Sequence, residues 1–397
     1  MNQRPFLSLS RRQVVRGLLA STAFGVARLA AGCSSSGDTA DDAAKDAAST
    51  GGDDLVVGFI YVGPKDDYGY NQSHAIGAAA MAKIPGIKIV EEANVPETNA
   101  VQETMRSMIE LDGAKILFPT SFGYFDPHIL QLAEEFPEVQ FFHCGSVYDE
   151  KVHPSNVGSY FGYIDEAQYI AGIVAGETTK TDKLGFIAAK PIPQVLRNIN
   201  SFTLGARSVN PKATVQVIFT GDWSLPVKES EATNSMADQS IDVVTCHVDS
   251  PKVIMETAEK RGIYCSGYHT DQAPLAPKGY LTGAEWDWSS VYTQYAKDLL
   301  GGKTLMDGGI PHLLRGGFSD RFCTLSAYGP AVSEKVQADA NAVKEKLIAN
   351  EMAIYQGEIK DNTGKVQIPS DKKYDQKAIE LEQMDWLVDG VDGKVAG

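Results

Sequence analysis

The sequence predicts an α/β protein made of two doubly wound lobes, and three observations support this fold class. Short continuous apolar runs recur after residue 54, and such runs are typical of strands buried in parallel sheets. Helical segments separate these runs, which indicates right-handed βαβ crossovers. The alternation restarts near residue 165 and predicts a second lobe of similar size. Because small-ligand sites lie at the carboxyl ends of parallel strands, we expect a ligand cleft between the lobes.

Length and composition exclude several other classes of protein. At about 150 residues per domain, a chain of 397 residues is expected to hold two or three domains. A hydrophobic fraction of 43% is enough for a sizeable core. The formal net charge of −15 argues against nucleic acid or an anionic membrane surface as a partner, since both attract clustered Lys and Arg. The chain has no apolar run of about 18 residues, and its five cysteines are too few for a disulfide scaffold.

Residues 1–32 are predicted to form an export signal peptide. This segment contains five arginines and no acidic residue, and residues 10–16 (SRRQVVR) resemble a twin-arginine export motif. A short apolar stretch over residues 17–31 follows, with small residues at its end, as is typical of a signal peptide. The alternative is a short N-terminal helix of the folded domain. We favour the signal because a polar, serine-rich tract follows at once.

Cys33 resembles the lipid-modified first residue of a bacterial lipoprotein. Leu29 lies four residues before Cys33 rather than the usual three, and Arg28 interrupts the apolar stretch, so export is better supported than lipidation. Residues 33–54 form a predicted disordered tether, because the stretch after Cys33 carries six Asp, one Lys and no large apolar residue. Such a solvated tether would hold the folded domain away from a membrane.

The first lobe is expected to comprise residues 55–164 together with residues 284–303. Its strands are predicted from apolar runs at residues 55–61, 87–90, 115–118 and 139–143. Its helices are predicted between those runs, at residues 72–82, 100–111 and 127–135. Each strand is thus joined to the next by a helix, as parallel strands require.

The second lobe is expected to comprise residues 165–283 together with residues 304–397, although the packing of the segment after Thr304 stays open. Its helices are predicted at residues 166–177, 195–208, 228–236 and 253–261. Its strands are predicted at residues 184–188, 214–219, 243–246 and 264–267. The order of elements repeats that of the first lobe, which predicts two similar sheets facing one another.

Cysteine and histidine residues offer possible disulfides and metal ligands. The cysteines after the signal segment are Cys144, Cys246, Cys265 and Cys323. A disulfide between two of them stays open, but we favour four buried apolar residues, because neighbouring parallel strands seldom suit disulfide geometry. His247 with Asp249, and His269 with Asp271, follow strand ends and could bind a metal. We favour hydrogen bonding for these pairs, because no larger cluster of ligands accompanies them.

Four short motifs spread over residues 55–391 point to one family of proteins. Residues 66–72 (DDYGYNQ) resemble D-D-x-S-F-N-Q, and residues 165–172 (DEAQYIAG) are similar to E-A-x-Y-L-A-G. Residues 183–197 resemble the segment that opens the second lobe in this family, and residues 384–391 (MDWLVDGV) resemble the family's C-terminal segment. All four resemble, in order, the basic membrane protein (BMP) family of lipoprotein receptors of ABC transporters, which includes purine nucleoside receptors. This resemblance implies a type I periplasmic-binding-protein fold, in which two lobes joined by three crossings close on a ligand.

Aromatic side chains from both lobes are expected to hold a planar ligand. Tyr70 would stack on one face of the ligand, Trp223 would cover the opposite face, and Phe122 would form a wall of the cleft. Asn71 would donate and accept hydrogen bonds. In the alternative, Asn71 caps a helix while Tyr70 lies in the core. Trp223 could likewise pack on its own lobe, and Phe122 could be hydrophobic filler.

Three further residues are predicted to line the cleft from the second lobe. Asp249 and Asp271 follow successive strands, and Asp271 resembles an acid that contacts the ligand in nucleoside-binding members of the family. Each carboxylate could accept hydrogen bonds from ring or ribose donors, or could instead cap the next helix. Tyr268 would add another wall.

Glu285 and Trp286 mark the clearest departure from the family. On an ungapped alignment, nucleoside-binding members carry Lys at the position of Glu285. An acid there would favour N–H donors, and Trp286 would fill space where a sugar would otherwise lie. The departure implies a free purine base, or a nucleoside held differently, and disfavours phosphate because like charges repel in a desolvated cleft. We therefore expect free purine bases to bind more tightly than nucleosides.

Together these features predict a monomeric, extracytoplasmic substrate-binding protein that delivers a purine base or nucleoside to an ABC permease in the inner membrane. It is expected to need no cofactor or metal, to bind no nucleic acid, and to contact the membrane only through a lipid anchor. A flavin ligand stays open. The alternatives are an enzyme similar to purine nucleoside hydrolases, for which Asp66 and Asp67 give slight support, and a ligand-sensing lipoprotein without transport. Known catalytic motifs are absent, so no catalytic residue is predicted.

Overall fold

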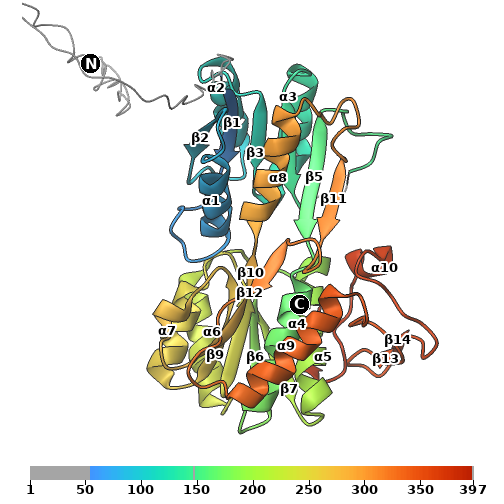
Figure 1. Cartoon of the computed structure of the whole chain (residues 1–397). Coiled ribbons are helices and arrows are strands. Elements are labelled where there is room, and N and C mark those ends of the chain that lie inside the picture. The colour runs from blue at the N-terminus through green and yellow to red at the C-terminus, as the bar shows by residue number, and fades with distance from the viewer. Residues whose placement is uncertain (1–53, 146–147, 396–397) are drawn as a thin grey trace, which may run out of the picture. The chain divides into compact units, whose positions relative to one another are not determined.

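A computed structural model describes residues 54–145 and 148–395 of the chain. These residues form two sheets, each with helices packed on both faces, as Figure 1 shows. The two-lobed α/β fold predicted from the alternation of apolar runs and helices is therefore confirmed. The predicted signal peptide and Cys33 lie outside the described residues. None of the helices within the described ranges is long and apolar enough to span a membrane.

The first sheet has the strand order β11-β5-β4-β3-β1-β2, and its strand pairs are parallel. The strands are β1 (Leu55–Ile60), β2 (Ile87–Glu92), β3 (Ile116–Pro119), β4 (Gln140–Cys144), β5 (Val157–Gly162) and β11 (Leu313–Gly316). The helices are α1 (Tyr70–Met81), α2 (Asn99–Glu110), α3 (Leu130–Glu135) and α8 (Trp288–Leu300). Short helical turns, η3 (Phe122–Tyr124) and η4 (Phe125–Ile129), precede α3.

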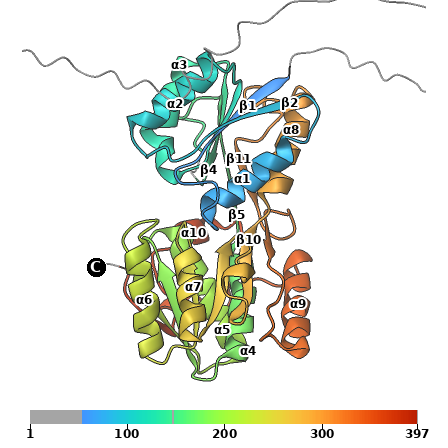
Figure 2. The same cartoon turned by 90° about the vertical axis from the view of Figure 1, so that its left-hand side faces the viewer.

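Side chains alternate between the two faces of this first sheet, as the pleat of a strand requires. Phe59 and Phe118 belong to the core beneath α1 and α8, whereas Ile60 and Leu117 belong to the core beneath α2 and α3. Figure 2 shows these two helix pairs on opposite faces of the sheet. Strands buried on both faces explain why the sequence reads as continuous apolar runs.

The second sheet has the strand order β12-β10-β9-β8-β6-β7-β15. The strands are β6 (Lys183–Ala188), β7 (Thr214–Phe219), β8 (Val243–His247), β9 (Tyr264–His269), β10 (Tyr280–Trp286), β12 (Cys323–Leu325) and β15 (Val391–Asp392). The helices are α4 (Asp165–Thr178), α5 (Pro193–Val209), α6 (Pro226–Asp238), α7 (Lys252–Arg261), α9 (Glu334–Ile348) and α10 (Ile379–Glu382). Figure 2 shows α6 and α7 on one face of this sheet and α4 and α5 on the other. The small elements η5 (Ala273–Leu275), β13 (Ile359–Lys360) and β14 (Val366–Ile368) lie outside the main sheets.

Helices α4 and α5 pack so closely that glycine is required where they cross. A Cβ atom on Gly172 would lie 2.0 Å from the carbonyl oxygen of Phe202. A Cβ atom on Gly205 would lie 2.0 Å from the carbonyl oxygen of Tyr169. The two helix backbones are therefore in direct contact.

The lobe boundaries differ from those predicted from the sequence. Residues 284–286, assigned to the first lobe with 284–303, are the end of β10 in the second sheet. The segment 304–397, assigned to the second lobe, contains β11, which pairs with β5 in the first sheet. The chain therefore passes between the sheets after β5, after β10 and after β11. These crossings place Tyr163, Trp286 and their neighbours beside the cleft.

Several strands were absent from the sequence prediction, β5, β10, β11 and β12 among them, and one helix begins differently. β5 (VGSYFG) and β10 (YLTGAEW) contain glycine and polar residues, so neither reads as an apolar run. The segment predicted as a helix over residues 127–135 begins as the π-helical turn η4 before α3. The other predicted elements occur at their predicted places, with ends shifted by a few residues.

The cysteines of the described residues are buried and form no disulfide. They are Cys144, Cys246, Cys265 and Cys323. Burial raises the pKa of the Cys144 thiol to about 12, so it stays protonated at neutral pH. The favoured interpretation of four buried small residues is confirmed.

Candidate ligand-binding site

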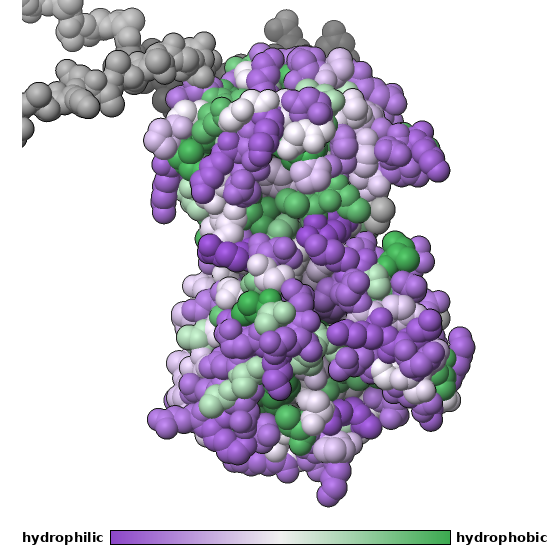
Figure 3. Space-filling model, turned by 45° about the vertical axis from the view of Figure 1, so that its right-hand side comes forward, coloured by the Kyte–Doolittle hydropathy of each residue, from purple (hydrophilic) through white to green (hydrophobic). Residues whose placement is uncertain are grey.

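Two adjoining compartments lie between the lobes, at the carboxyl ends of the strands. The first, called here the aromatic compartment, encloses about 480 Å³, part of it open to solvent. Its lining residues are Tyr70, Ser121, Phe122, Cys144, Gly145, Phe161, Gln194, Trp223, His247, Asp249, Tyr268, His269 and Trp286. Figure 3 shows hydrophobic side chains gathered at the hollow between the two lobes. This volume falls within the range of small-molecule pockets.

The second compartment, called here the polar compartment, encloses about 520 Å³ and adjoins the first. Its lining residues are Gly145, Phe161, Gly162, Tyr163, Ile164, Asp165, Gln194, Arg197, Asn198, His247, Tyr268, Arg315, Leu381 and Glu382. The two compartments share Gly145, Phe161, Gln194, His247 and Tyr268. A ligand in the aromatic compartment can therefore extend into the polar one.

Tyr70 reaches the aromatic compartment from the first residue of α1. Its hydroxyl donates to the carbonyl oxygen of Thr120 at 2.5 Å, and its ring meets His269 edge-on, with ring centroids 5.4 Å apart. Asp67 organises this helix start, because its carboxylate accepts from the backbone N–H groups of Gly69 and Asn71. Tyr70 is therefore held in a fixed orientation at the boundary between the lobes.

Asn71 is not among the residues that line either compartment. Its side chain donates to the carboxylate of Asp67 at 2.8 Å and accepts from the backbone N–H of Gly63 at 3.2 Å. It is 2% exposed. These contacts use the amide to shape the loop before α1, so the structure favours the role at the helix start over a ligand contact.

The lobes touch where α1 meets the loop after β8. The backbone N–H of Tyr70 donates to the carbonyl oxygen of Asp249 at 2.8 Å, and the hydroxyl of Ser250 donates to that of Asp67 at 2.9 Å. A Cβ atom on Gly69 would lie 1.9 Å from the Asp249 carbonyl oxygen. Only glycine allows this approach, which brings Tyr70 of one lobe beside Asp249 of the other.

Trp286 is the most firmly positioned ring of the aromatic compartment. Its indole N–H donates to Nδ1 of His269 at 2.9 Å. Its ring stacks on Trp288, with centroids 4.6 Å apart and planes 18° apart. Because this indole can only donate, Nε2 of His269 carries the imidazole hydrogen and donates to the carbonyl oxygen of Val248 at 3.1 Å. Both ring nitrogens of His269 are therefore used.

Two other predicted rings are less constrained by the protein. Phe122, in η3, is 47% exposed although it is apolar. Trp223 lies in the loop after β7, with the Lys190 ammonium group 5.2 Å from its ring centroid and the His247 ring 6.4 Å away. Both rings line the aromatic compartment, and Trp223 also packs against the hydrophobic core.

His247 and Tyr268 form a neutral hydrogen-bonded pair at the junction of the compartments. Asn198 donates to Nδ1 of His247 at 2.9 Å and to the hydroxyl of Tyr268 at 3.0 Å. Burial lowers the pKa of His247 to about 3, so its imidazole is neutral at physiological pH. Among the residues described, no group of His, Cys, Asp and Glu side chains is arranged to hold a metal ion. The hydrogen bonds expected of His247 and His269 are present.

Asp249 is the acid that lines the aromatic compartment. Its backbone N–H donates to the carbonyl oxygen of Trp223 at 2.7 Å, but its carboxylate accepts no hydrogen bond from the described residues. Burial raises its pKa well above the ordinary value, and the nearby carboxylates of Asp67 and Glu97 act in the same direction. A ligand that donates an N–H group to this carboxylate would offset the free-energy cost of burying its charge.

Asp271 and Glu285 lie outside both compartments, unlike the sequence prediction. Asp271 is exposed, and its carboxylate accepts the backbone N–H of Ala273 at 2.9 Å. Glu285 accepts from the hydroxyl of Ser326, on the opposite side of β10 from Trp286. Neighbouring side chains of a strand point to opposite faces of the sheet. Because Trp286 lines the cleft, its strand neighbour Glu285 points away from it.

The structure thus brings part of the predicted site together and adds residues that the sequence did not indicate. The predicted residues that line the cleft are Tyr70, Phe122, Trp223, Asp249, Tyr268 and Trp286. The additional lining residues Ser121, Cys144, Gly145, Phe161 and Gln194 follow or end strands, or begin α5. Their position at strand ends is the signal that could have found them.

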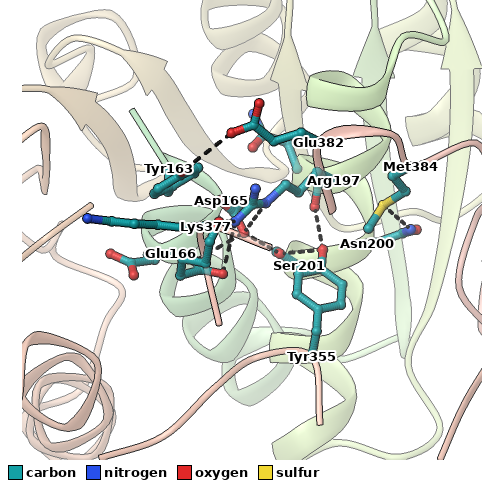
Figure 4. A network of polar contacts seen from close by, with 12 residues as sticks. Tyr163, Asp165, Glu166, Arg197, Asn200, Ser201, Tyr355, Lys377, Glu382 and Met384 are labelled. Carbon is teal, nitrogen blue, oxygen red and sulfur yellow. Dashed lines mark hydrogen bonds and ion pairs between the residues drawn. The ribbon is translucent and has the colours of Figure 1, made fainter. Parts of the chain in front are cut away.

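Paired charges line the polar compartment. Arg197 lies 3.0 Å from the carboxylate of Asp165, and Arg315 lies 3.6 Å from that of Glu382. The hydroxyl of Tyr163 also donates to Glu382, at 3.3 Å. Figure 4 shows several of these side chains converging from α4, α5 and the C-terminal part of the chain.

Comparison with known proteins identifies relatives over most of the chain. The model of a family described as ABC transporter substrate-binding protein PnrA-like matches residues 55–358. A purine-binding protein from Brucella abortus (strain 2308) is 30% identical over 343 residues, which cover 86% of this chain and 94% of that protein. A putative ABC transporter glucose-binding protein from Haloferax volcanii is 28% identical over 344 residues, which cover 87% of this chain and 82% of that protein.

Solved structures share the two-lobed fold. A solute-binding protein of an ABC transporter system from Conexibacter woesei matches with a TM-score of 0.62 and 21% identity, covering 75% of this chain and 97% of that chain. One from Aeropyrum pernix K1 matches with a TM-score of 0.63 and 18% identity, covering 83% and 97%. These likenesses confirm the expected fold of periplasmic solute-binding proteins.

Proposed function

Since this chain belongs to the Bmp family of PnrA-like ABC transporter substrate-binding proteins, we propose that its cleft binds a purine base or purine nucleoside for uptake through an ABC permease. Substrate-binding proteins of ABC transporters work outside the cytoplasm and pass a small molecule to a permease. In our proposal residues 1–32 direct export, Cys33 carries a lipid anchor, and the protein acts as a monomer. The purine-binding relative from Brucella abortus supports the choice of ligand.

One observation carries the proposal. The Asp249 side chain, which accepts no hydrogen bond from the described residues, lines a compartment walled by aromatic rings. Purines have two apolar faces and an edge with N–H donors. We assign the two faces to Tyr70 of the first lobe and Trp223 of the second, and the edge to Asp249. Stacking of a base on an aromatic side chain contributes about 1–3 kcal/mol. A ligand ring held by side chains of both lobes would also favour the arrangement in which the two lobes are in contact.

Binding to a panel of ligands tests the proposal. Thermal unfolding is measured with adenine, guanine, adenosine, inosine, riboflavin and glucose, and titration calorimetry follows for each ligand that stabilises the protein. We expect the purines to raise the unfolding temperature and glucose to leave it unchanged. Stabilisation by glucose alone would favour the activity named for the Haloferax relative, and stabilisation by riboflavin alone would favour a flavin carrier.

A turnover assay separates this proposal from a hydrolase. Adenosine and inosine are incubated with the protein, and the release of free base is followed by chromatography. We expect the nucleosides to be recovered intact. Release of base at a rate proportional to protein concentration would contradict a purely binding role.

A further inference from the structure

We propose that Glu382, carried by the C-terminal part of the chain, keeps the polar compartment electrically neutral and thereby restricts the cleft to purines without a negatively charged substituent. This inference rests on the proposed function. It assigns a specificity role to a residue of α10, which lies outside the residues matched by the family model. Four observations support it: the connection of the compartments, the charges, the anchoring of Glu382, and its position on the wall.

The position of the polar compartment makes it the place for a substituent on the purine. It adjoins the aromatic compartment through Phe161, His247 and Tyr268, which line both. A ring held between Tyr70 and Trp223 would therefore present its substituent to the polar compartment. Its polar wall suits a group that forms hydrogen bonds, such as a sugar.

The charges of this compartment balance because of Glu382. Asp165 neutralises Arg197, and the side chains of this pair are only 2% and 6% exposed. Arg315, which is 7% exposed, faces Glu382, which is 20% exposed. Arginine stays protonated in proteins, so without the Glu382 carboxylate the residues that line the compartment would carry more positive than negative charge. With an excess of positive charge the compartment would attract a phosphate group. In the native protein the Glu382 carboxylate removes this excess and repels the phosphate.

The anchoring of the C-terminal segment, residues 355–388, explains why Glu382 lies there. The hydroxyl of Tyr355 donates to the carbonyl oxygen of Arg197 at 3.1 Å, and the Arg197 guanidinium donates to the Gln376 carbonyl oxygen at 3.0 Å. Asn200 accepts the backbone N–H of Val388 at 2.8 Å. These bonds attach the segment to α5 on both sides of α10, as Figure 4 shows in part. Glu382 is therefore held against the compartment by contacts outside the cleft.

The test compares two substitutions that remove one negative charge from the same short helix. Glu382→Gln removes the carboxylate at the compartment but keeps an acceptor for Tyr163. Glu380→Gln removes an exposed carboxylate of α10 that lines neither compartment and serves as the control. Titration calorimetry measures the dissociation constants of adenosine and of AMP for both variants and for the native protein.

We expect native protein and Glu380→Gln to bind adenosine and to discriminate strongly against AMP. In Glu382→Gln the ratio of the AMP to the adenosine dissociation constant should fall by about tenfold to a hundredfold, as expected for one charge at ~6 Å and an effective dielectric constant of about 20. An unchanged ratio, or an equal fall in Glu380→Gln, would overturn the assignment.

Two further results keep the inference separate from the proposed function. Native protein that binds neither adenine nor adenosine contradicts the proposed function itself. Native protein that binds adenine but not adenosine retains that function and overturns the role of the polar compartment. If Glu382→Gln does not fold, as judged by circular dichroism, Glu382→Ala makes the same charge change with a smaller side chain, and the same ratio decides.

Discussion

Replacing Trp223 by alanine removes one of the two rings that we assign to the faces of the ligand. The ring is partly buried and packs against the hydrophobic core, with Lys190 5.2 Å from its centroid and the His247 ring 6.4 Å away. Its backbone contributes the carbonyl oxygen that accepts from Asp249, and alanine keeps that bond. The substitution should therefore affect binding more than folding.

The magnitude follows from these contacts. Loss of base–aromatic stacking costs about 1–3 kcal/mol, which corresponds to a dissociation constant raised about 5- to 150-fold. Loss of the cation–π contact with Lys190 costs about 0.5–1 kcal/mol at a partly exposed site. The free energy of unfolding should thus fall by less than about 2 kcal/mol. The ion pair of Lys190 with Asp222, at 2.9 Å, does not involve the ring and should persist.

Titration calorimetry with the purine that binds the native protein measures this effect. Trp386→Ala is the matched control, because Trp386 is partly buried in the C-terminal segment and lines neither compartment. We expect weak binding in Trp223→Ala and native affinity in Trp386→Ala. If folded Trp223→Ala binds within twofold of the native protein, Trp223 serves packing alone and the stacking site is refuted.

Three other predictions concern the contact between the lobes, the acid Glu285 outside the cleft, and the pH dependence of stability. Gly69→Ala would place a Cβ atom 1.9 Å from the Asp249 carbonyl oxygen, so we expect a larger radius of gyration by X-ray scattering and at least tenfold weaker binding; native values for both would contradict the lobe contact. Glu285→Gln should leave the dissociation constant within about twofold, because Glu285 bonds to Ser326 outside the cleft, and a tenfold change in calorimetry would contradict this placement. His247 has a pKa of about 3 when folded and about 6.5 when unfolded, so it contributes stability above pH 6.5 that is lost as the pH falls toward 3. Between pH 7 and pH 5 this loss is about 2 kcal/mol, and urea titrations should show His247→Gln losing less stability than the native protein over that range; an equal loss would contradict a buried neutral His247.

Sequence patterns predicted the fold where strands are buried on both faces. The apolar runs at β1 and β6 read directly as strands, because no polar residue interrupts them. The strands β5 and β10 escaped prediction, because glycine and polar residues occupy them near the cleft. β11 was assigned to the wrong lobe because its pairing with β5 joins segments about 150 residues apart, and no local pattern encodes that pairing.

The candidate site was predictable where a residue's place on its element decides its direction. Tyr70 and Asp249 follow strand-end loops, and they line the cleft as expected. The prediction for Glu285 was wrong about its direction, because the alternation along β10 points Trp286 into the cleft and Glu285 away from it. Asn71 bonds within its own loop, which a motif alone does not reveal. Glu382 pairs with Arg315, which belongs to a distant part of the sequence, so its place at the cleft could be found only from the folded chain.

Native mass spectrometry in competition tests the central claim most directly. The protein is mixed with equal concentrations of adenine, adenosine, glucose and riboflavin, and the mass of the intact complex identifies the ligand that is held. We predict one bound molecule of adenine or adenosine, lost in Trp223→Ala. A complex with glucose or riboflavin would contradict a purine-binding cleft. The absence of any complex in a sample of folded native protein would contradict it as well.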